Sequence, residues 1–248
     1  MREIPGKRRG LLRFRRSEGP AQLGAALTCA TAWQWPVLPG VGLKPSHGRG
    51  RGSGGGPGQS CACPDPECVV PGAHPFDPGV LAATTDERMI RWWWTNRPTA
   101  PVVLTTGGAA PCAISLPAVA GAVALTALDG MGMRLGPVVA TATRWSLLVA
   151  PYSLERLGEL LYAKDRVPSS LRFHGQGGYL VLPPSQTGAG QVWWERAPSS
   201  SPGSRLRPGG AEPIAGSAAP WLPDVEAVVD ALVAASNGAP DGGSRLAY

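Results

Sequence analysis

The sequence is poor in charge and in the side chains that enzymes most often use for catalysis. Only 16% of its 248 residues are charged, and just three are histidine. It has no apolar run approaching the roughly 18–20 residues that a helix needs to cross a bilayer, which argues against a transmembrane helix. An Arg-Arg pair near the start is not followed by a clean apolar segment, so we expect no export signal and a cytoplasmic location.

Glycine and proline are abundant instead, with 34 and 27 residues, while 43% of the residues are hydrophobic. This composition predicts a compact middle between loose ends. The net charge of +6 arises in residues 1–60, which carry ten Lys/Arg against two acids, whereas residues 61–248 are nearly neutral. The basic start could contact nucleic acid or an anionic surface, or it could simply be solvated.

Apolar spacing and Gly/Pro boundaries predict a mixture of helices and strands. Helical spacing is found in residues 20–34, 83–98, 118–132, 153–165 and 222–236, the second with Thr84 or Thr85 as its N-cap and Pro98 as its stop. Runs of strand length occupy 35–41, 101–107, 111–116, 136–143, 145–151, 169–185 and 191–197. Such a mixture, with several hairpins, favours an α+β fold over a strictly parallel sheet.

Composition also predicts how the chain is organised. The expected parts are a basic disordered tail (1–19), a main domain (20–196) with a flexible loop (43–60) and a Cys/His knuckle (61–74), a Pro/Gly/Ser linker (197–220), a C-terminal helix (221–237) and a disordered tail (238–248). The C-terminal helix would either pack back on the core or contact a partner.

Residues 60–75 read SCACPDPECVVPGAHP and bring Cys61, Cys63, Cys68 and His74 into a short stretch. Three thiolates and an imidazole suit tetrahedral Zn²⁺, and four protein ligands would leave no open position for catalysis. A cysteine cluster in the cytoplasm is more often a metal site than a disulfide framework. The sequence therefore favours a structural zinc, with free cysteines or a disulfide as the alternatives.

Adjacent tryptophans and paired glycines are the other notable features. Trp92–Trp94 should place two side chains in the core and the third against a neighbour or at the surface, where a base could stack on it. Gly107–Gly108 and Gly177–Gly178 flank predicted strands. Glycine there permits a positive φ or the close approach of a phosphate.

Four motifs follow one another between about residues 20 and 196: WPVLPGVGLKPS, CACPDPECVVPGAHP, ATTDERMIRWWWTNRPTAPVVLTTG and GGYLVLPPSQTGAGQVWWE. This order resembles the bifunctional primase–polymerase domain of actinobacterial and phage or plasmid replication proteins. The resemblance implies an α+β fold related to archaeo-eukaryotic primases, with an RNA-recognition-like mixed sheet, flanking helices and a small Cys/His loop. Family members often carry the Cys/His knuckle just before a His-Pro step, which further favours zinc.

The chemistry of that family needs carboxylates that hold two divalent ions, Mg²⁺ or Mn²⁺, against an incoming triphosphate. The resemblance places the family's Asp-x-Asp pair at Ser115 and Pro117, and its third acid at Arg172. The histidine of its nucleotide-binding Ser-x-His element falls at Ser146. The resemblance thus implies the family's fold without its catalytic residues.

We therefore expect a catalytically degenerate domain that binds nucleotide or nucleic acid without synthesis, and that could work with a replication protein such as a helicase. The candidate phosphate-binding residues are Arg144, Ser146, Arg172, His174, Gly177 and Gly178.

Two alternatives stay open. An active DNA primase/polymerase would have to draw its metal ligands from acids such as Asp129, Glu155, Glu159 and Asp165. A protein-interaction module would have no nucleic-acid role. Three convergent carboxylates on the sheet would favour the enzyme, an acid-free face with Arg and His would favour binding, and an apolar face would favour the interaction module.

Overall fold

A computed structural model describes residues 19–45, 59–199 and 219–238. The helices are α1 (Gly19–Leu27), η1 (Thr28–Ala32), η2 (Val80–Ala82), α2 (Glu87–Asn96), α3 (Ala118–Gly130), α4 (Leu154–Tyr162) and α5 (Val225–Gly238). The strands are β1 (Val37–Pro39), β2 (Leu43–Pro45), β3 (Gln59–Cys61), β4 (Val102–Thr105), β5 (Cys112–Pro117), β6 (Val138–Ala140), β7 (Arg144–Val149), β8 (Arg172–His174), β9 (Tyr179–Leu182), β10 (Ser185–Thr187) and β11 (Gly190–Arg196). Apart from Gly19 and Gly238, the expected terminal tails lie outside the described residues, as do most of the expected loop and linker.

The strands form three sheets. The largest has the order β10-β11-β6-β7-β5-β8, the second has the order β1-β4-β9, and β2 pairs with β3. Every strand pair in the described part is antiparallel. The predicted α+β class with flanking helices is confirmed.

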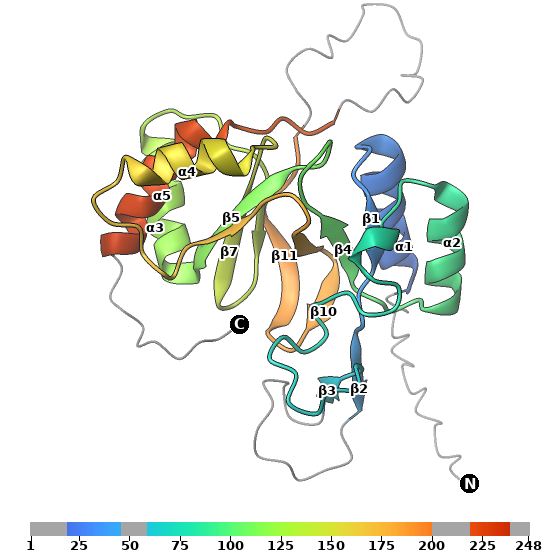
Figure 1. Cartoon of the computed structure of the whole chain (residues 1–248). Helices are drawn as coiled ribbons and strands as arrows, with labels where there is room; N and C mark the ends of the chain where they lie inside the picture. The colour runs from blue at the N-terminus through green and yellow to red at the C-terminus, as the bar shows by residue number, and fades with distance from the viewer. Residues whose placement is uncertain (1–18, 46–58, 200–218, 239–248) are drawn as a thin grey trace, which may run out of the picture.

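The six-stranded sheet is the middle layer of the molecule. Helices α3, α4 and α5 cover one of its faces, while the three-stranded sheet with α1 and α2 lies on the other side (Figure 1). Side chains of β5 alternate between the two faces: Ile114 and Leu116 join the core under the helices, whereas Ala113 joins the core shared with the three-stranded sheet. Ser115 therefore faces the three-stranded sheet.

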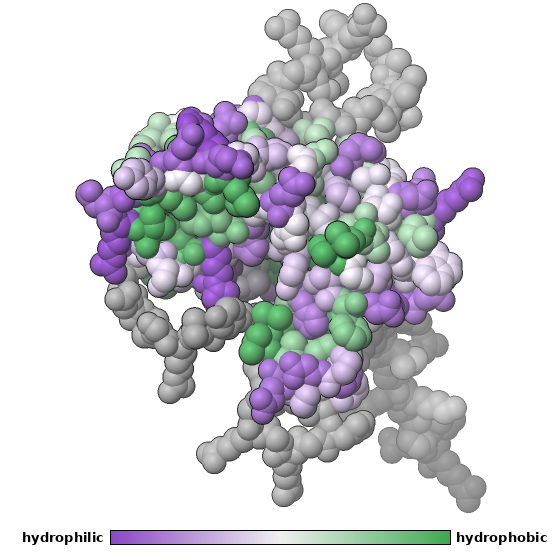
Figure 2. Space-filling model, viewed as in Figure 1, coloured by the Kyte–Doolittle hydropathy of each residue, from purple (hydrophilic) through white to green (hydrophobic). Residues whose placement is uncertain are grey.

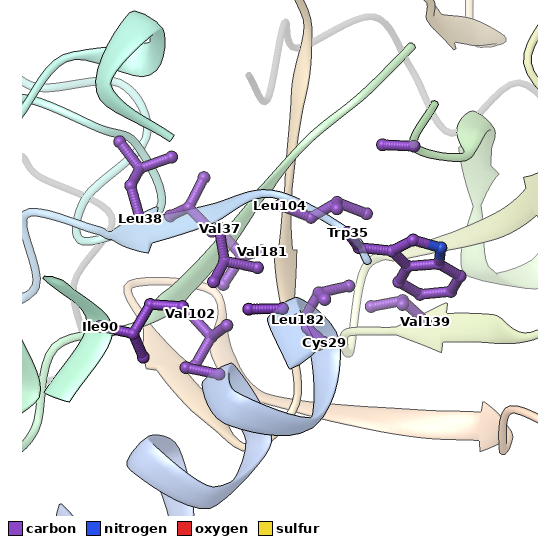
Figure 3. Packing of buried hydrophobic residues seen from close by; sticks show 14 of the residues in the cluster. Cys29, Trp35, Val37, Leu38, Ile90, Val102, Leu104, Val139, Val181 and Leu182 are labelled. Atoms are coloured by element: carbon purple, nitrogen blue, oxygen red, sulfur yellow. The ribbon is translucent and has the colours of Figure 1, made fainter. Parts of the chain in front are cut away.

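A hydrophobic core joins the two larger sheets. Trp35, which precedes β1, is 2% exposed and lies beside Val139 of β6 (Figure 3). Leu104 of β4 and Leu182 of β9 are fully buried in the same core. The packing of these side chains fixes the three-stranded sheet against the face that carries Ser115.

Helix α2 confirms one prediction and corrects another. Trp93 and Trp94 are buried and Trp92 is 62% exposed, as the adjacent tryptophans predicted. The N-cap, however, is Asp86, whose carboxylate accepts a hydrogen bond from the Met89 N–H at 2.8 Å. The prediction of Thr84 or Thr85 was wrong because the backbone of Thr84 is bonded to Val37, which holds it outside the helix.

The C-terminal helix packs back on the core, the first of the two alternatives. Its residues Val228, Val229 and Leu232 are at most 2% exposed and lie in the core under α3. Some hydrophobic surface remains over the layer of α3, α4 and α5 (Figure 2). No helix in the described ranges is long and apolar enough to cross a membrane.

Candidate functional site

The Cys/His knuckle, residues 61–74, gathers the four predicted metal ligands. The Nε2 atom of His74 lies 3.4 Å from the Sγ atoms of both Cys61 and Cys68, and all four ligand atoms, including Cys63 Sγ, lie within 4.8 Å of one another. Sulfur and nitrogen ligands of one tetrahedral zinc are separated by about 3.5 Å, given typical zinc–ligand distances. The group can therefore hold a metal ion such as zinc.

The backbone around the knuckle explains why these side chains converge. Strand β3 ends at Cys61, which pairs with Leu43 of β2, and Gly72 bridges to Gly42. Gly72 has φ +71°, and a Cβ there would lie 2.9 Å from two side-chain carbons of Leu43, so only glycine fits this turn. The Gly72 N–H also donates to Cys61 Sγ at 3.2 Å.

The hydrogen bonds of His74 and Cys61 suit metal ligands. The Pro75 carbonyl accepts a hydrogen bond from His74 Nδ1 at 2.9 Å, which leaves Nε2 available as the ligand. Burial opposes ionisation of Cys61, but hydrogen bonds from Cys63, Gly72 and His74 outweigh it and lower the pKa of the Cys61 thiol to about 7. Burial, followed by the neighbouring Cys61 and Cys63, raises the pKa of the Cys68 thiol to about 12, so Cys61 ionises first in this group. None of the five cysteines is in a disulfide.

The six-stranded sheet brings together residues that are far apart in the sequence. Ser115 of β5 is directly opposite Ser146 of β7 on one side and Arg172 of β8 on the other. In the same register Pro117 faces Arg144, and Ala113 faces His174. The positions to which the resemblance assigns metal and nucleotide ligands are thus cross-strand neighbours on one face.

Arg144 contacts Ser115 directly. Its Nε donates to Ser115 Oγ at 3.0 Å, and its Nη2 donates to the carbonyls of Ser115 and Ser170 at 2.9 and 2.8 Å. Burial, followed by the positive charge of Arg172, lowers the pKa of Arg144 to about 10. Sequence reasoning missed Ser170, because no local pattern indicates that its carbonyl reaches a strand near residue 144.

His174 experiences the same positive surroundings. Burial lowers its pKa first, and the charges of Arg144 and Arg172 lower it further, against a smaller opposite effect of a hydrogen bond with the backbone of Tyr179. We refer to Arg144, Arg172 and His174 as the cationic cluster. No carboxylate is among the groups that shift the pKa of Arg144 or His174.

A pair of loops closes the end of the sheet beside His174. The N–H groups of Gly177 and Gly178 donate to the carbonyls of Thr106 and Gly175 at 3.2 and 3.1 Å, and the hydroxyl of Thr106 also donates to the Gly175 carbonyl, at 2.6 Å. Both glycine amides thus have protein acceptors in this structure, and their contact with a phosphate stays a prediction. Thr106 was not predicted, although it directly precedes the glycine pair at 107–108.

The acids that an active enzyme would need lie elsewhere in the described part. Asp129, Glu155, Glu159 and Asp165 are exposed and sit on or directly after α3 and α4, which cover the opposite face of the sheet. Asp129 accepts hydrogen bonds from Arg196 at 2.6 and 2.8 Å, and Glu159 pairs with Arg156 at 2.8 Å. The knuckle is the only group of three or more His, Cys, Asp or Glu among the described residues that could hold a metal ion.

Comparison with known proteins gives one match. The family model described as bifunctional DNA primase/polymerase, N-terminal, matches residues 26–215, which include both the knuckle and the face that carries Ser115. No curated protein and no solved structure matches the chain.

Proposed function

The chain belongs to the bifunctional DNA primase/polymerase N-terminal domain family, and from this premise we propose that it binds the phosphates of a nucleotide or nucleic acid at the cationic cluster without joining nucleotides. Membership itself indicates a DNA primase/polymerase-like function. The proposal concerns the activity of this particular member of the family.

The observation that carries the proposal is the placement of Arg172 directly opposite Ser115, with Arg144 beside them, on a face where the resemblance leads us to expect acids. Joining nucleotides by a two-metal mechanism needs carboxylates that hold both ions. Ser115 and Ser146 offer only hydroxyls, Pro117 offers no side-chain donor or acceptor, and Arg172 repels cations. This face therefore suits an anion better than a pair of divalent cations.

The electrostatics of the cluster also support an anionic ligand. After burial, the charge of Arg172 lowers the pKa of Arg144, and the charges of Arg144 and Arg172 lower the pKa of His174, so the charged forms of Arg144 and His174 are destabilised where they stand. Phosphate oxygens accept charge-assisted hydrogen bonds from guanidinium groups, often two at a time. A bound phosphate would offset the repulsion and raise the pKa of His174.

Triphosphate affinity tests the proposal. A charge-assisted hydrogen bond contributes about 1.5–3 kcal/mol, so we expect Arg172→Ala to weaken dTTP binding roughly 10- to 150-fold. Arg91→Ala is the matched control, because Arg91 is exposed on α2 and pairs with Glu87; its affinity should equal that of the wild type. An affinity unaffected by Arg172→Ala would refute the phosphate site.

Nucleotide incorporation tests the absence of synthesis. The purified chain should extend neither a primed nor an unprimed DNA template when Mg²⁺ or Mn²⁺ is supplied. Incorporation that persists through stringent purification would mean that acids from outside the described residues complete an active site, and the proposal would be wrong.

We also infer that zinc is the ion of the knuckle and that its role is structural. The set of three thiolates and one imidazole matches zinc in ligand type and number. The knuckle is tied to the body of the domain by the Gly188 N–H, which donates to the Pro71 carbonyl at 2.7 Å. Zinc would hold this loop in shape beside the turn between β10 and β11.

A further inference from the structure

A groove of about 290 Å³ lies where the end of α1 and the π-helical turn η1 meet the turn after β9 and strand β11. We call it the tryptophan groove. Its lining residues are Ala25, Thr28, Cys29, Trp33, Pro183, Pro184 and Trp194. No charged side chain lines it, so whatever part of a ligand enters must be uncharged and largely apolar.

The two indoles are held as rigid walls. Trp33 packs against the buried Trp35, with ring centroids 4.9 Å apart and planes inclined by 58°. Trp194 is half-buried and packs against the core that joins the two larger sheets. Flat aromatic surfaces that are already fixed lose little entropy when a planar ligand stacks on them.

The backbone beside Trp33 is unusual in two respects. Residues Thr28–Ala32 form a π-helical turn, and Gln34 has φ +57°, which is rare for a residue other than glycine. The Gln34 side chain donates to the carbonyls of Ala30 and Thr31, both at 3.1 Å, and so pins this turn. π-Turns and left-handed non-glycine residues concentrate at functional sites.

We propose that the tryptophan groove stacks an unpaired base of single-stranded nucleic acid. A base is planar, uncharged and able to stack whatever its sequence, which matches the lining. Residues 1–18, which carry seven Lys/Arg against two Glu, join α1 directly. The groove end of that nine-residue helix is about 12 Å from its start, at 1.5 Å per residue, and the most basic stretch of the sequence directly precedes the helix that lines the groove.

A base within a strand fits the groove better than a free nucleotide does. The groove offers no cation to a phosphate, so a single nucleotide would stack its base and leave its own phosphates without a partner. A strand gains affinity from neighbouring phosphates outside the groove. This inference goes beyond the cationic cluster, and it stands or falls independently of it.

The test compares the affinity of the full chain for a 12-nucleotide oligo-dT with its affinity for a strand of the same length that lacks bases, at the same salt concentration. Stacking of one base changes affinity roughly 5- to 150-fold, so the wild type should prefer oligo-dT by that factor. Trp33→Ala and Trp194→Ala should lose the preference while their affinity for the abasic strand stays the same. Trp92→Ala, which removes an exposed indole on α2, should keep it.

A second variant guards against loss of folding in the tryptophan variants. Thr28→Phe fills the groove from an exposed position and leaves both indoles in place, so it should remove the preference in a chain with wild-type circular dichroism. Arg172→Ala should weaken both strands equally and leave their ratio unchanged, which separates failure of the phosphate site from failure of the groove.

Three results would overturn the proposal. One is a wild type without preference for the base-bearing strand, and another is a preference that survives Thr28→Phe and both tryptophan variants. The third is binding of another ligand in the groove. This would be seen if dTTP alone bound there as tightly as oligo-dT does, or if a proline-rich peptide bound the wild type but not Thr28→Phe.

Discussion

Alanine in place of Gly107 should destabilise the domain far more than alanine in place of its neighbour Gly108. Both glycines have a positive φ, of +89° and +67°, so either substitution carries a conformational cost of about 1–2 kcal/mol. A Cβ at Gly108 would meet no atom within 4 Å, whereas one at Gly107 would lie 2.4 Å from Cα and 2.8 Å from N of Gln176. The difference between the two variants isolates this collision.

The collision forces the two loops apart by roughly 1 Å, because non-bonded carbons rest at about 3.5–4.0 Å. Such a shift breaks the hydrogen bonds that Thr106 makes to Gly175 and Gly177, each contributing about 0.5–1.5 kcal/mol. We expect the free energy of unfolding to fall by about 1–2 kcal/mol for Gly108→Ala and by about 2–5 kcal/mol for Gly107→Ala. Urea denaturation measures both, and equal losses would refute the reasoning.

Three further predictions address the cationic cluster, the knuckle and the core. NMR titration should find the pKa of His174 below 6.5, and Arg144→Met should raise that pKa because a repelling charge is removed. The folded state then binds fewer protons at His174 than the unfolded state does, so the free energy of unfolding should fall as the pH drops below about 6.5. Metal analysis should find one zinc per chain, lost in Cys63→Ser because one of four ligands is missing. Trp94→Ala should lower the free energy of unfolding by about 3–5 kcal/mol, since Trp94 is 2% exposed, whereas Trp92→Ala, at a side chain 62% exposed, should change it by less than about 0.5 kcal/mol.

Each of these has a control that keeps the rest of the molecule constant. Arg196→Met removes an arginine paired with Asp129 and should leave the pKa of His174 unchanged. Cys29→Ala removes a buried thiol outside the knuckle and should retain zinc. If Arg144→Met left the pKa of His174 unchanged, the assignment of the cationic cluster would be contradicted. If Cys63→Ser still bound zinc, the assignment of the knuckle would be contradicted.

Features encoded by neighbouring residues could be predicted from the sequence. The knuckle is one, because the four ligands lie in a single short loop whose turns bring them together. Helix α4 is another: Ser153 accepts from the Arg156 N–H at 3.1 Å, as its Ser start predicted. In both cases the deciding contacts span few residues, so local spacing was sufficient.

Features that depend on long-range pairing could not be predicted in the same way. The contact of Arg144 with Ser115 needs the register of β5 against β7, which no spacing reveals. The polar strand β10 forms only because β11 pairs with it, and it was not separated from its neighbours in the sequence. The Asp86 cap follows from the attachment of Thr84 to β1, another contact between distant segments.

The position of β9 has a consequence for the order in which the chain can fold. Strand β4 is paired on one side by β1 and on the other by β9, so the three-stranded sheet is complete only when residues 179–182 have been made. Strand β8, which directly precedes β9 in the chain, pairs with β5 in the six-stranded sheet. Contacts between distant segments form late and slowly, so neither sheet can be completed early during synthesis. On the ribosome, the edge of the apolar strand β4 that β9 will cover would stay exposed until the Gly-Gly turn and β9 emerge.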